Sequence, residues 1–144
     1  MRVLVQKSLK SSVVVNDKTV GSIEHGLVLL VGLTDGDNSS TIDYMVKKVL
    51  NLRIFEDENG VMNKSILDVG GDILSISQFT LYGDATKGNR PSYVKALSSD
   101  KAYPLYEEFN KKLSEYVKVQ TGRFGANMKV NIINDGPTTI LLER

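Results

Sequence analysis

The segment "GLVLLVGL", residues 26–33, constrains the fold of this chain more than any other. Its apolar residues form one unbroken run that is too short for a typical amphipathic helix, and many of them are branched. A strand with apolar side chains on both faces has to be covered on both faces. We therefore expect a central strand here, with other elements packed on either side of it.

The residues before this run have the patterns of two further strands and a hairpin. From Met1 to Lys7, Val3 and Val5 alternate with residues that point to the opposite face, which predicts a strand. Apolar residues from 13 to 15 then lead into the turn "NDK", and a second extended segment follows up to Glu24. This order predicts a β-hairpin ahead of the central strand.

Two segments have helical periodicity. The first follows the loop "TDGDNSS", in which Ser39 or Ser40 is expected to act as the N-cap. The second is expected to have Pro104 near its first turn and to be broken by "TGRFGAN". Their apolar residues recur at helical spacing: Ile42, Met45, Val46, Val49 and Leu50 in the first helix, and Leu105, Tyr106, Phe109, Leu113, Tyr116 and Val117 in the second.

The remaining segments complete the expected fold class. "ILSISQFTLYG" alternates as a strand with Ile73, Ser75, Ser77 and Phe79 on one side, "EDENG" and "VGGD" are turns, and "MKVNIIN" and "TTILLE" are strands. The longest loop is "GDATKGNRPS". We predict an α+β fold in which a largely antiparallel, barrel-like sheet is packed by two or three helices. Residues 1–144 are expected to form a single domain.

Composition excludes several classes of protein. Eighteen Lys and Arg against 17 Asp and Glu give a net charge of +1, so any RNA contact has to be local. Without cysteine there is no disulfide, thiolate nucleophile or cysteine metal site. No apolar run approaches the roughly 18 residues that span a membrane. We therefore expect a cytoplasmic protein that does not enter a membrane.

Few residues offer conventional catalytic chemistry. His25, the single histidine, lies in "EHG" between two expected strands, where a solvated turn residue is the favoured interpretation. This argues against a Ser-His-Asp triad and against a zinc site. The acidic groups Glu56–Glu58 and Asp35–Asp37 lie beside Asn and Gly, so they are expected to be solvated loops. We expect no metal and no cofactor.

Two other polar features leave alternatives open. Ser77, Gln78 and Thr80 in "SQFTLYG" predict either the edge of a sheet or a cavity lined with donors and acceptors. Lys87, Arg90 and Arg123 lie on expected loops, where positive charge either serves solubility or neutralises phosphates. The spacing of these residues in the sequence does not decide between the alternatives.

Five motifs follow one another along the chain: "NLRIFEDENGVMN", "SQFTLYGD", "KGNRPSY", "TGRFGANM" and "NDGPTT". In this combination they resemble the motifs of the D-aminoacyl-tRNA deacylases, also called D-tyrosyl-tRNA deacylases, and the likeness spans nearly the whole chain. The resemblance implies a homodimeric cytosolic hydrolase without metal or cofactor. Its substrate would be aminoacylated tRNA, and it would cleave the ester between a D-amino acid and the 3′-terminal ribose, as a proofreading step in translation.

The resemblance also implies roles for named residues. The Gly136–Pro137 bond would be cis, and the motif around it would enter the active site of the other subunit. Two groups of residues follow from the family motifs: Ser77, Gln78, Phe79 and Thr80 would form the catalytic strand, and Met128, Asn134, Gly136, Pro137 and Thr139 would bind substrate and select its chirality.

Chiral selection would then depend on the main chain. Two backbone carbonyls of the Gly-Pro pair would meet the side chain of an L-aminoacyl group, whereas a D side chain would point toward solvent. Glycine would be poorly excluded, so Gly-tRNA is an expected second substrate. For hydrolysis, Thr80 is one nucleophile candidate, and attack by water assisted by the ribose 2′-hydroxyl is the preferred alternative, because the sequence supplies no evident base.

Three positions depart from the family pattern. Lys7 stands where arginine is common, and since an ammonium and a guanidinium differ in geometry, we expect its hold on the Gly-Pro loop to be absent or weaker. Thr138 replaces a usual valine, and Tyr93 a common phenylalanine. Two rival functions stay open on the same scaffold: a non-catalytic tRNA-binding module and a small-molecule esterase.

Overall fold

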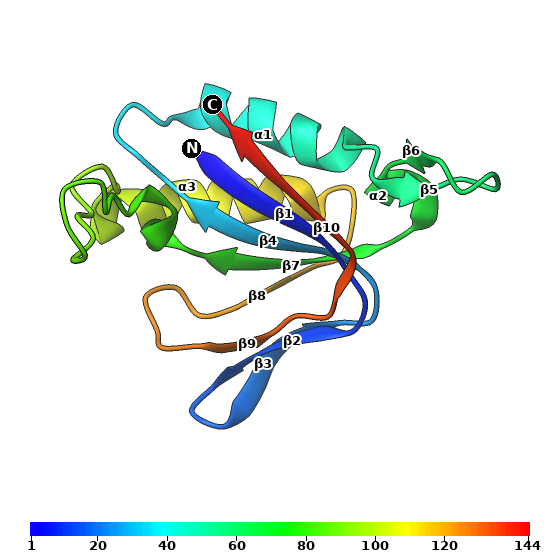
Figure 1. The fold of residues 1–144 in the computed structure, drawn as a ribbon, viewed down its shortest axis with the longest axis horizontal. Helices are drawn as coiled ribbons and strands as arrows, with labels where there is room; N and C mark the ends of the chain where they lie inside the picture. Colours follow the sequence, from blue (N-terminus) through cyan, green and yellow to red (C-terminus); the bar gives the residue numbers. More distant parts are fainter.

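A computed structural model describes all residues from Met1 to Arg144, and its framework is a five-stranded sheet (Figure 1). The order of strands across it is β10-β1-β4-β7-β8. Helices α1 and α3 pack on one face of this sheet, and a small sheet of order β3-β2-β9 lies away from them. The strands of the large sheet are β1 (Arg2–Ser8), β4 (Gly26–Gly32), β7 (Asp72–Ser77), β8 (Val119–Thr121) and β10 (Asn134–Glu143).

The other elements are shorter or lie outside this sheet. The small sheet contains β2 (Ser11–Val15), β3 (Lys18–Ile23) and β9 (Lys129–Asn131), and a separate pair is formed by β5 (Phe55–Glu56) and β6 (Met62–Lys64). The helices are α1 (Ser39–Asn51), α2 (Ile66–Val69), the 3₁₀-helix η1 (Phe79–Tyr82) and α3 (Ser99–Ser114). None of the helices combines the length and the hydropathy needed to cross a lipid bilayer.

The central strand predicted over residues 26–33 is β4, which lies between β1 and β7. Leu27 and Leu29 face the main core under the helices, and Val28 belongs to a second cluster between the two sheets. Both faces of the strand are therefore covered, as its unbroken apolar run predicts. At the start of β4, a Cβ on Gly26 would lie 1.9 Å from the main-chain oxygen of Asp72, so only glycine allows these backbones to approach.

Strand pairing confirms the predicted α+β class. In the large sheet β1 is antiparallel to both β10 and β4, while β4–β7 and β7–β8 are parallel. All pairs of the two smaller sheets are antiparallel. The fold is thus largely antiparallel, with a parallel section where the chain passes through α1 and α3 between strands.

Both predicted helices form, with corrected ends. The N-cap of α1 is Asn38, and not Ser39 or Ser40, because its side chain accepts hydrogen bonds from two first-turn N–H groups. Helix α3 begins at Ser99, so Pro104 lies inside it, in the turn that follows the first. It ends at Ser114, and the following segment forms β8, whose last residue, Thr121, is the first of "TGRFGAN".

Three further expectations are corrected. The strand predicted through Phe79 ends at Ser77, where the chain turns into η1. Helix α2 was not expected, although Ser65 forms a capping box with Asp68 ahead of its short apolar run. Asp37 is not a solvated loop residue, because its carboxylate lies 2.7 Å from the terminal ammonium of Met1 and its side chain is 4% exposed.

Candidate active site

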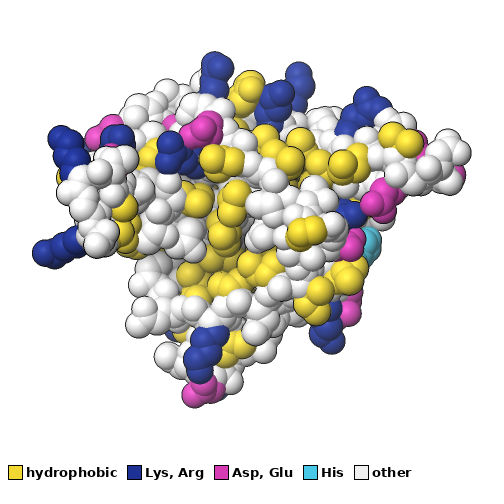
Figure 2. Space-filling view, in the orientation of Figure 1, with side chains coloured by type: hydrophobic (Ala, Val, Ile, Leu, Met, Phe, Trp, Pro, Cys, Tyr) yellow, Lys and Arg dark blue, Asp and Glu magenta, His cyan; other side chains and the backbone are white.

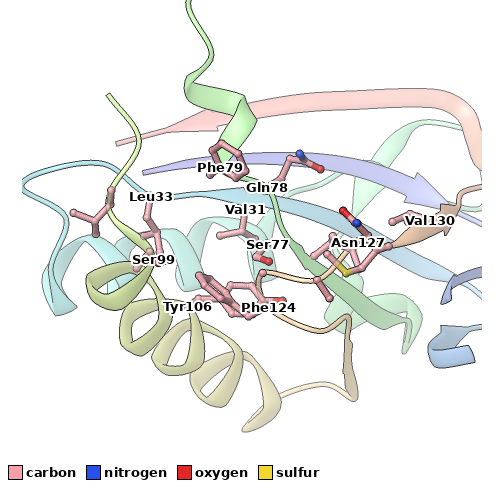
Figure 3. A pocket seen from close by; sticks show the side chains of 16 residues that line it. Val31, Leu33, Ser77, Gln78, Phe79, Ser99, Tyr106, Phe124, Asn127 and Val130 are labelled. Atoms are coloured by element: carbon pink, nitrogen blue, oxygen red, sulfur yellow. The ribbon is translucent and has the colours of Figure 1, made fainter. Parts of the chain in front are cut away.

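A cleft of about 520 Å³ opens at the carboxyl ends of β4 and β7 (Figure 3). This volume lies within the range of about 300–1,000 Å³ that small-molecule sites occupy. The N-terminal half of α3 forms one wall, and the loop between β8 and β9 forms another. The lining residues are Val31, Leu33, Ile76, Ser77, Gln78, Phe79, Leu97, Ser99, Ala102, Tyr106, Phe124, Gly125, Ala126, Asn127, Met128 and Val130.

The polar residues of "SQFTLYG" reach this cleft because β7 ends beside β4. Ser77 is paired with Val31 at the last position of the register, and the N–H of Gln78 donates to the Val31 oxygen at 2.6 Å. The chain then turns, which brings Ser77, Gln78 and Phe79 to the mouth. Since β7 lies between β4 and β8, the sheet-edge alternative is wrong, and the cavity alternative holds for Ser77 and Gln78.

Thr80 is in a different environment from its three neighbours. It is exposed and does not line the cleft. The amide nitrogen of Gln78 donates a hydrogen bond to its hydroxyl oxygen, and no carboxylate or imidazole is bonded to it. His25 is exposed at the opposite end of β4, just before the strand begins. An amide is not a base, so the structure gives the Thr80 hydroxyl no group that would activate it.

Tyr106 joins three parts of the cleft wall. Its hydroxyl donates to the main-chain oxygen of Ser75 at 2.8 Å, and the N–H of Gly122 donates to the same oxygen at 3.3 Å. Its ring lies 5.7 Å from that of Phe124, centroid to centroid. Burial raises the pKa of Tyr106, so its hydroxyl stays protonated and remains a donor. Helix α3, strand β7 and the 122–128 loop are therefore fixed to one another.

Sequence reasoning missed much of this wall. Tyr106 was expected only as a core residue of an amphipathic helix, and nothing in its spacing separates a cleft-facing position from a buried one. Phe124 and Asn127 belong to the motif "TGRFGANM", which was recognised without a role for them. Met128 of the same motif does line the cleft.

A second group of predicted residues lies on a loop of β10. Ser8 of β1 pairs with Asn134 and Gln6 pairs with Thr139, so residues 135–138 bulge out opposite Lys7 alone. The Asn134 amide closes this bulge by donating to the main-chain oxygens of Lys7 and Thr138, at 3.0 and 2.9 Å. The Thr139 hydroxyl donates to the Asn134 side-chain oxygen at 3.1 Å. Asn134 and Thr139 thus shape the loop that carries Gly136 and Pro137.

The tip of this loop is exposed and requires glycine. The peptide bond between Gly136 and Pro137 is cis, and both residues are exposed. Gly136 has a φ of +112°, and a Cβ there would lie 2.6 Å from the hydroxyl oxygen of Thr138. A side chain at position 136 would therefore force the loop to change.

Lys7 contacts the same loop from beneath. It is 4% exposed, and its Nζ lies 3.2 Å from the Asp135 carboxylate and 3.5 Å from that of Glu56. The lysine therefore does reach the residue next to Gly136, so of the two expectations, an absent or a weaker hold on the loop, the first is excluded. Its single ammonium contacts the loop at one side chain, whereas a guanidinium offers a planar pair of donors.

The two groups of predicted residues lie in different places. Ser77, Gln78, Phe79 and Met128 line the cleft, but Asn134, Gly136, Pro137 and Thr139 do not line the cleft of their own chain. Nor does any cluster of three or more His, Asp or Glu side chains have the spacing of a metal site.

The fold and the cleft define a small α+β protein with a candidate ligand site at the carboxyl ends of two parallel strands. The family model described as "D-Tyr-tRNA(Tyr) deacylase" matches residues 4–143. The chain therefore belongs to the D-Tyr-tRNA(Tyr) deacylase family, whose members are hydrolases of aminoacyl-tRNA esters.

Curated relatives agree with this assignment, and a solved structure shares the fold. The chain is 54% identical over 144 residues to a D-aminoacyl-tRNA deacylase of Geobacillus, with 99% of this chain and 95% of the relative covered. It is 55% identical to one of Clostridium tetani, with 99% and 97% covered. A solved structure described as "c-Myc DNA Unwinding Element Binding Protein" is 38% identical, with a TM-score of 0.94 and 100% and 99% of the chains covered.

Proposed function

We propose that the protein is a D-aminoacyl-tRNA deacylase formed by residues 1–144 as one domain. It would hydrolyse the ester between a D-amino acid and the 3′-terminal ribose of tRNA, which removes the wrong enantiomer before translation. The observation that carries the proposal is the match to the family over residues 4–143, combined with a cleft lined by Ser77, Gln78 and Phe79. Because its substrate takes part in translation, we place the protein in the cytoplasm.

The site is proposed to be shared between two copies of the chain. In this arrangement Gly136 and Pro137 of one copy enter the cleft of the other, and their carbonyls exclude the side chain of an L-aminoacyl group. The loop's position supports this, because it is exposed, held rigidly at its base by Asn134, and absent from the cleft of its own chain.

The surface around the loop supports a homodimer. Strand β10 is a ten-residue edge strand, and Ile133, Ile140 and Leu141 on or beside it are 54%, 36% and 48% exposed. Figure 2 shows hydrophobic side chains gathered in the hollow between the two sheets. Leu30, Val130 and Ile132 pack against the apolar cluster between these sheets and are only partly buried. Neighbouring exposed apolar side chains of this kind are a feature of protein–protein interfaces.

Hydrolysis is proposed to use the substrate's own 2′-hydroxyl. The environment of Thr80 supports this, since its hydroxyl accepts from an amide and has no base beside it. The cleft would position the ester, main-chain N–H groups at the end of β7 would stabilise the oxyanion, and the vicinal 2′-hydroxyl would assist the attacking water.

The test is a deacylation assay on purified protein with D-Tyr-tRNA, L-Tyr-tRNA and Gly-tRNA. We expect rapid loss of the D ester, slower loss of the glycyl ester and little loss of the L ester. Thr80→Ala should retain most activity, whereas tRNA ending in a 2′-deoxyribose should resist cleavage.

Other outcomes would identify a different function. Equal cleavage of the D and L esters would contradict chiral selection, and binding of tRNA without turnover would indicate a non-catalytic module. Hydrolysis of free D-amino acid esters at the rate of the tRNA ester would indicate a small-molecule esterase. Loss of activity in Thr80→Ala together with cleavage of the 2′-deoxy substrate would contradict the substrate-assisted mechanism.

A further inference from the structure

Three cations near the cleft have no function in the site described so far. Lys87, Arg90 and Arg123 are exposed, and none of them lies within 4 Å of a carboxylate. They lie on two segments that are far apart in sequence. An exposed Lys or Arg without an ion-pair partner commonly serves only solubility. The position of these three side chains relative to the cleft therefore decides whether they could also bind a substrate.

The first segment is a loop that leaves the cleft directly. Lys87 and Arg90 lie in the stretch closed by Asp84 and Ser92, whose main chains exchange hydrogen bonds of 2.9 and 2.8 Å. At the base of the loop, the ring of Tyr93 packs edge-on against that of the cleft residue Phe79, with 5.2 Å between centroids. The loop is therefore attached to one lip of the cleft.

The second segment forms another part of the lip. Arg123 precedes Phe124, which lines the cleft and packs against Tyr103 at 5.2 Å and Tyr106 at 5.7 Å, centroid to centroid. Figure 1 places the loop after η1, the start of α3 and the β8–β9 loop at the same end of the molecule. Lys and Arg side chains project from that end in Figure 2.

The charge of the first loop is locally positive although the whole chain is nearly neutral. From Gly83 to Lys95 the sequence has three cations and one carboxylate, which gives a local charge of 3 − 1 = +2, whereas the whole chain carries +1. That carboxylate, Asp84, is already engaged by the N–H and hydroxyl of Thr86 at 3.0 and 2.7 Å and by Lys95 at 3.5 Å. On α3, Asp100 is the acidic residue of the first turn.

We propose that Lys87, Arg90 and Arg123 form a cationic rim that binds phosphate groups of the tRNA 3′ strand and acceptor stem. The inference rests on the proposed function and adds to it the surface that holds the rest of the substrate. A cleft of about 520 Å³ accommodates an aminoacyl group and one nucleoside, so the preceding nucleotides have to cross its lip. Contacts to phosphates fix the register of the RNA and carry no base sequence.

The experiment compares two substrates that differ only in the RNA beyond the cleft. The variant Lys87→Ala/Arg90→Ala/Arg123→Ala is assayed on D-Tyr-tRNA and on the D-tyrosyl 3′-ester of adenosine. We expect kcat/KM on the tRNA to fall about tenfold or more through KM, and kcat/KM on the nucleoside ester to stay at the wild-type value. The slope of log kcat/KM against log salt concentration should shrink by about 2 to 3, as expected when three phosphate contacts are removed.

A matched triple variant separates a local effect from a loss of overall charge. Lys18→Ala/Lys47→Ala/Lys111→Ala removes three exposed cations that also lack an ion pair and do not line the cleft. This variant should behave as wild type on both substrates. Equal loss in the two triple variants, or an unchanged salt slope in the rim variant, would overturn the inference.

A binding readout keeps this result separate from the fate of the proposed function. Uncharged tRNA requires no turnover, and its Kd should rise about tenfold or more in the rim variant alone. If the wild type cleaves D-Tyr-tRNA, and the rim variant binds and cleaves tRNA as well as the wild type does, the rim does not bind tRNA while the enzyme assignment stands. If the wild type cleaves neither ester, the enzyme assignment fails, and the Kd for uncharged tRNA alone decides whether the rim binds RNA.

Discussion

At the scale of single residues, Lys7 connects the core of the protein to the loop proposed to select chirality. Its side chain is almost fully buried, yet its ammonium has two carboxylate partners at the surface, Asp135 and Glu56. Because Asp135 precedes Gly136, the position of the ammonium influences where the loop tip lies. Both carboxylates are partly exposed, so water weakens each pair and the lysine acts mainly by restricting the loop.

We predict that Lys7→Met loosens this loop. The ratio of kcat/KM for D-Tyr-tRNA to that for L-Tyr-tRNA should fall about tenfold, which corresponds to about 1.4 kcal/mol of lost discrimination. Lys7→Arg should keep the ratio at or above the wild-type value, because a guanidinium retains the charge and adds a second donor. Steady-state deacylation kinetics on both substrates measure this.

The control is Lys10→Met, which removes a pair of the same chemistry from an exposed site. Lys10 lies 3.8 Å from Glu24, and the two side chains are 72% and 79% exposed. The ratio of kcat/KM for D-Tyr-tRNA to that for L-Tyr-tRNA in Lys10→Met should equal that of the wild type. An unchanged ratio in Lys7→Met would show that Lys7 has no part in positioning the loop.

At the scale of secondary-structure elements, long periodic segments could be predicted and short ones could not. Strand β4 and helix α1 contain enough residues for their apolar patterns to be distinctive, and both form as predicted. Helix α2 and strand β8 have four and three residues, which is too few for a period to be recognised. The alternation in "ILSISQFTLYG" continued past Ser77 in the sequence, but the chain turns there because β7 ends beside β4.

The candidate site was predictable to a similar degree. The motifs identified the cleft residues Ser77 to Phe79 and Met128, because family patterns record function directly. Tyr106 was not identified, because its role depends on a hydrogen bond to Ser75 across 31 positions of sequence. Whether a polar residue lies on a sheet edge or in a cavity depends on which strand pairs beside it, and that is a property of tertiary structure.

The correction at the start of α1 gives a prediction about stability. Asn38 accepts from the N–H groups of Ser40 and Thr41 at 2.9 and 3.3 Å, so Asn38→Ala leaves both donors without their acceptor. We expect the free energy of unfolding to fall by about 1 kcal/mol, measured by urea denaturation.

Ser40→Ala is the matched substitution inside the same helix turn. Ser40 is exposed and its hydroxyl makes no hydrogen bond, so its removal should change stability by less than about 0.5 kcal/mol. A larger loss in Ser40→Ala than in Asn38→Ala would mean that the cap has been misassigned.

At the scale of the whole molecule, the cleft proposed for catalysis and the loop proposed for chiral selection lie in different places. The cleft lies at the carboxyl ends of β4 and β7, and the Gly136–Pro137 loop projects from the edge strand β10 without lining it. A monomer would therefore hold each half of a site without combining them. A symmetric pair of chains would bring each loop to the partner's cleft and form two complete sites.

Two single variants allow this arrangement to be tested. Gln78→Ala removes a cleft-lining amide, and Gly136→Ala places a Cβ against Thr138 in the selecting loop. Gly60→Ala is the control for the second change, because Gly60 also has a positive φ of +75° but has open space around it. Gly60→Ala should leave unchanged both the rate of deacylation and the preference for D-Tyr-tRNA over L-Tyr-tRNA.

The most direct measurement is complementation between these two variants. Gln78→Ala chains should lack hydrolysis, and Gly136→Ala chains should cleave L-Tyr-tRNA as well as D-Tyr-tRNA. The two are unfolded, mixed in equal amounts, refolded together and assayed for cleavage of L-Tyr-tRNA. If each site takes its cleft from one chain and its loop from the other, half of the Gly136→Ala clefts receive an intact loop, so cleavage of the L ester per Gly136→Ala chain should fall by about half. An unchanged rate per Gly136→Ala chain, with mixed dimers present, would contradict a site shared between subunits.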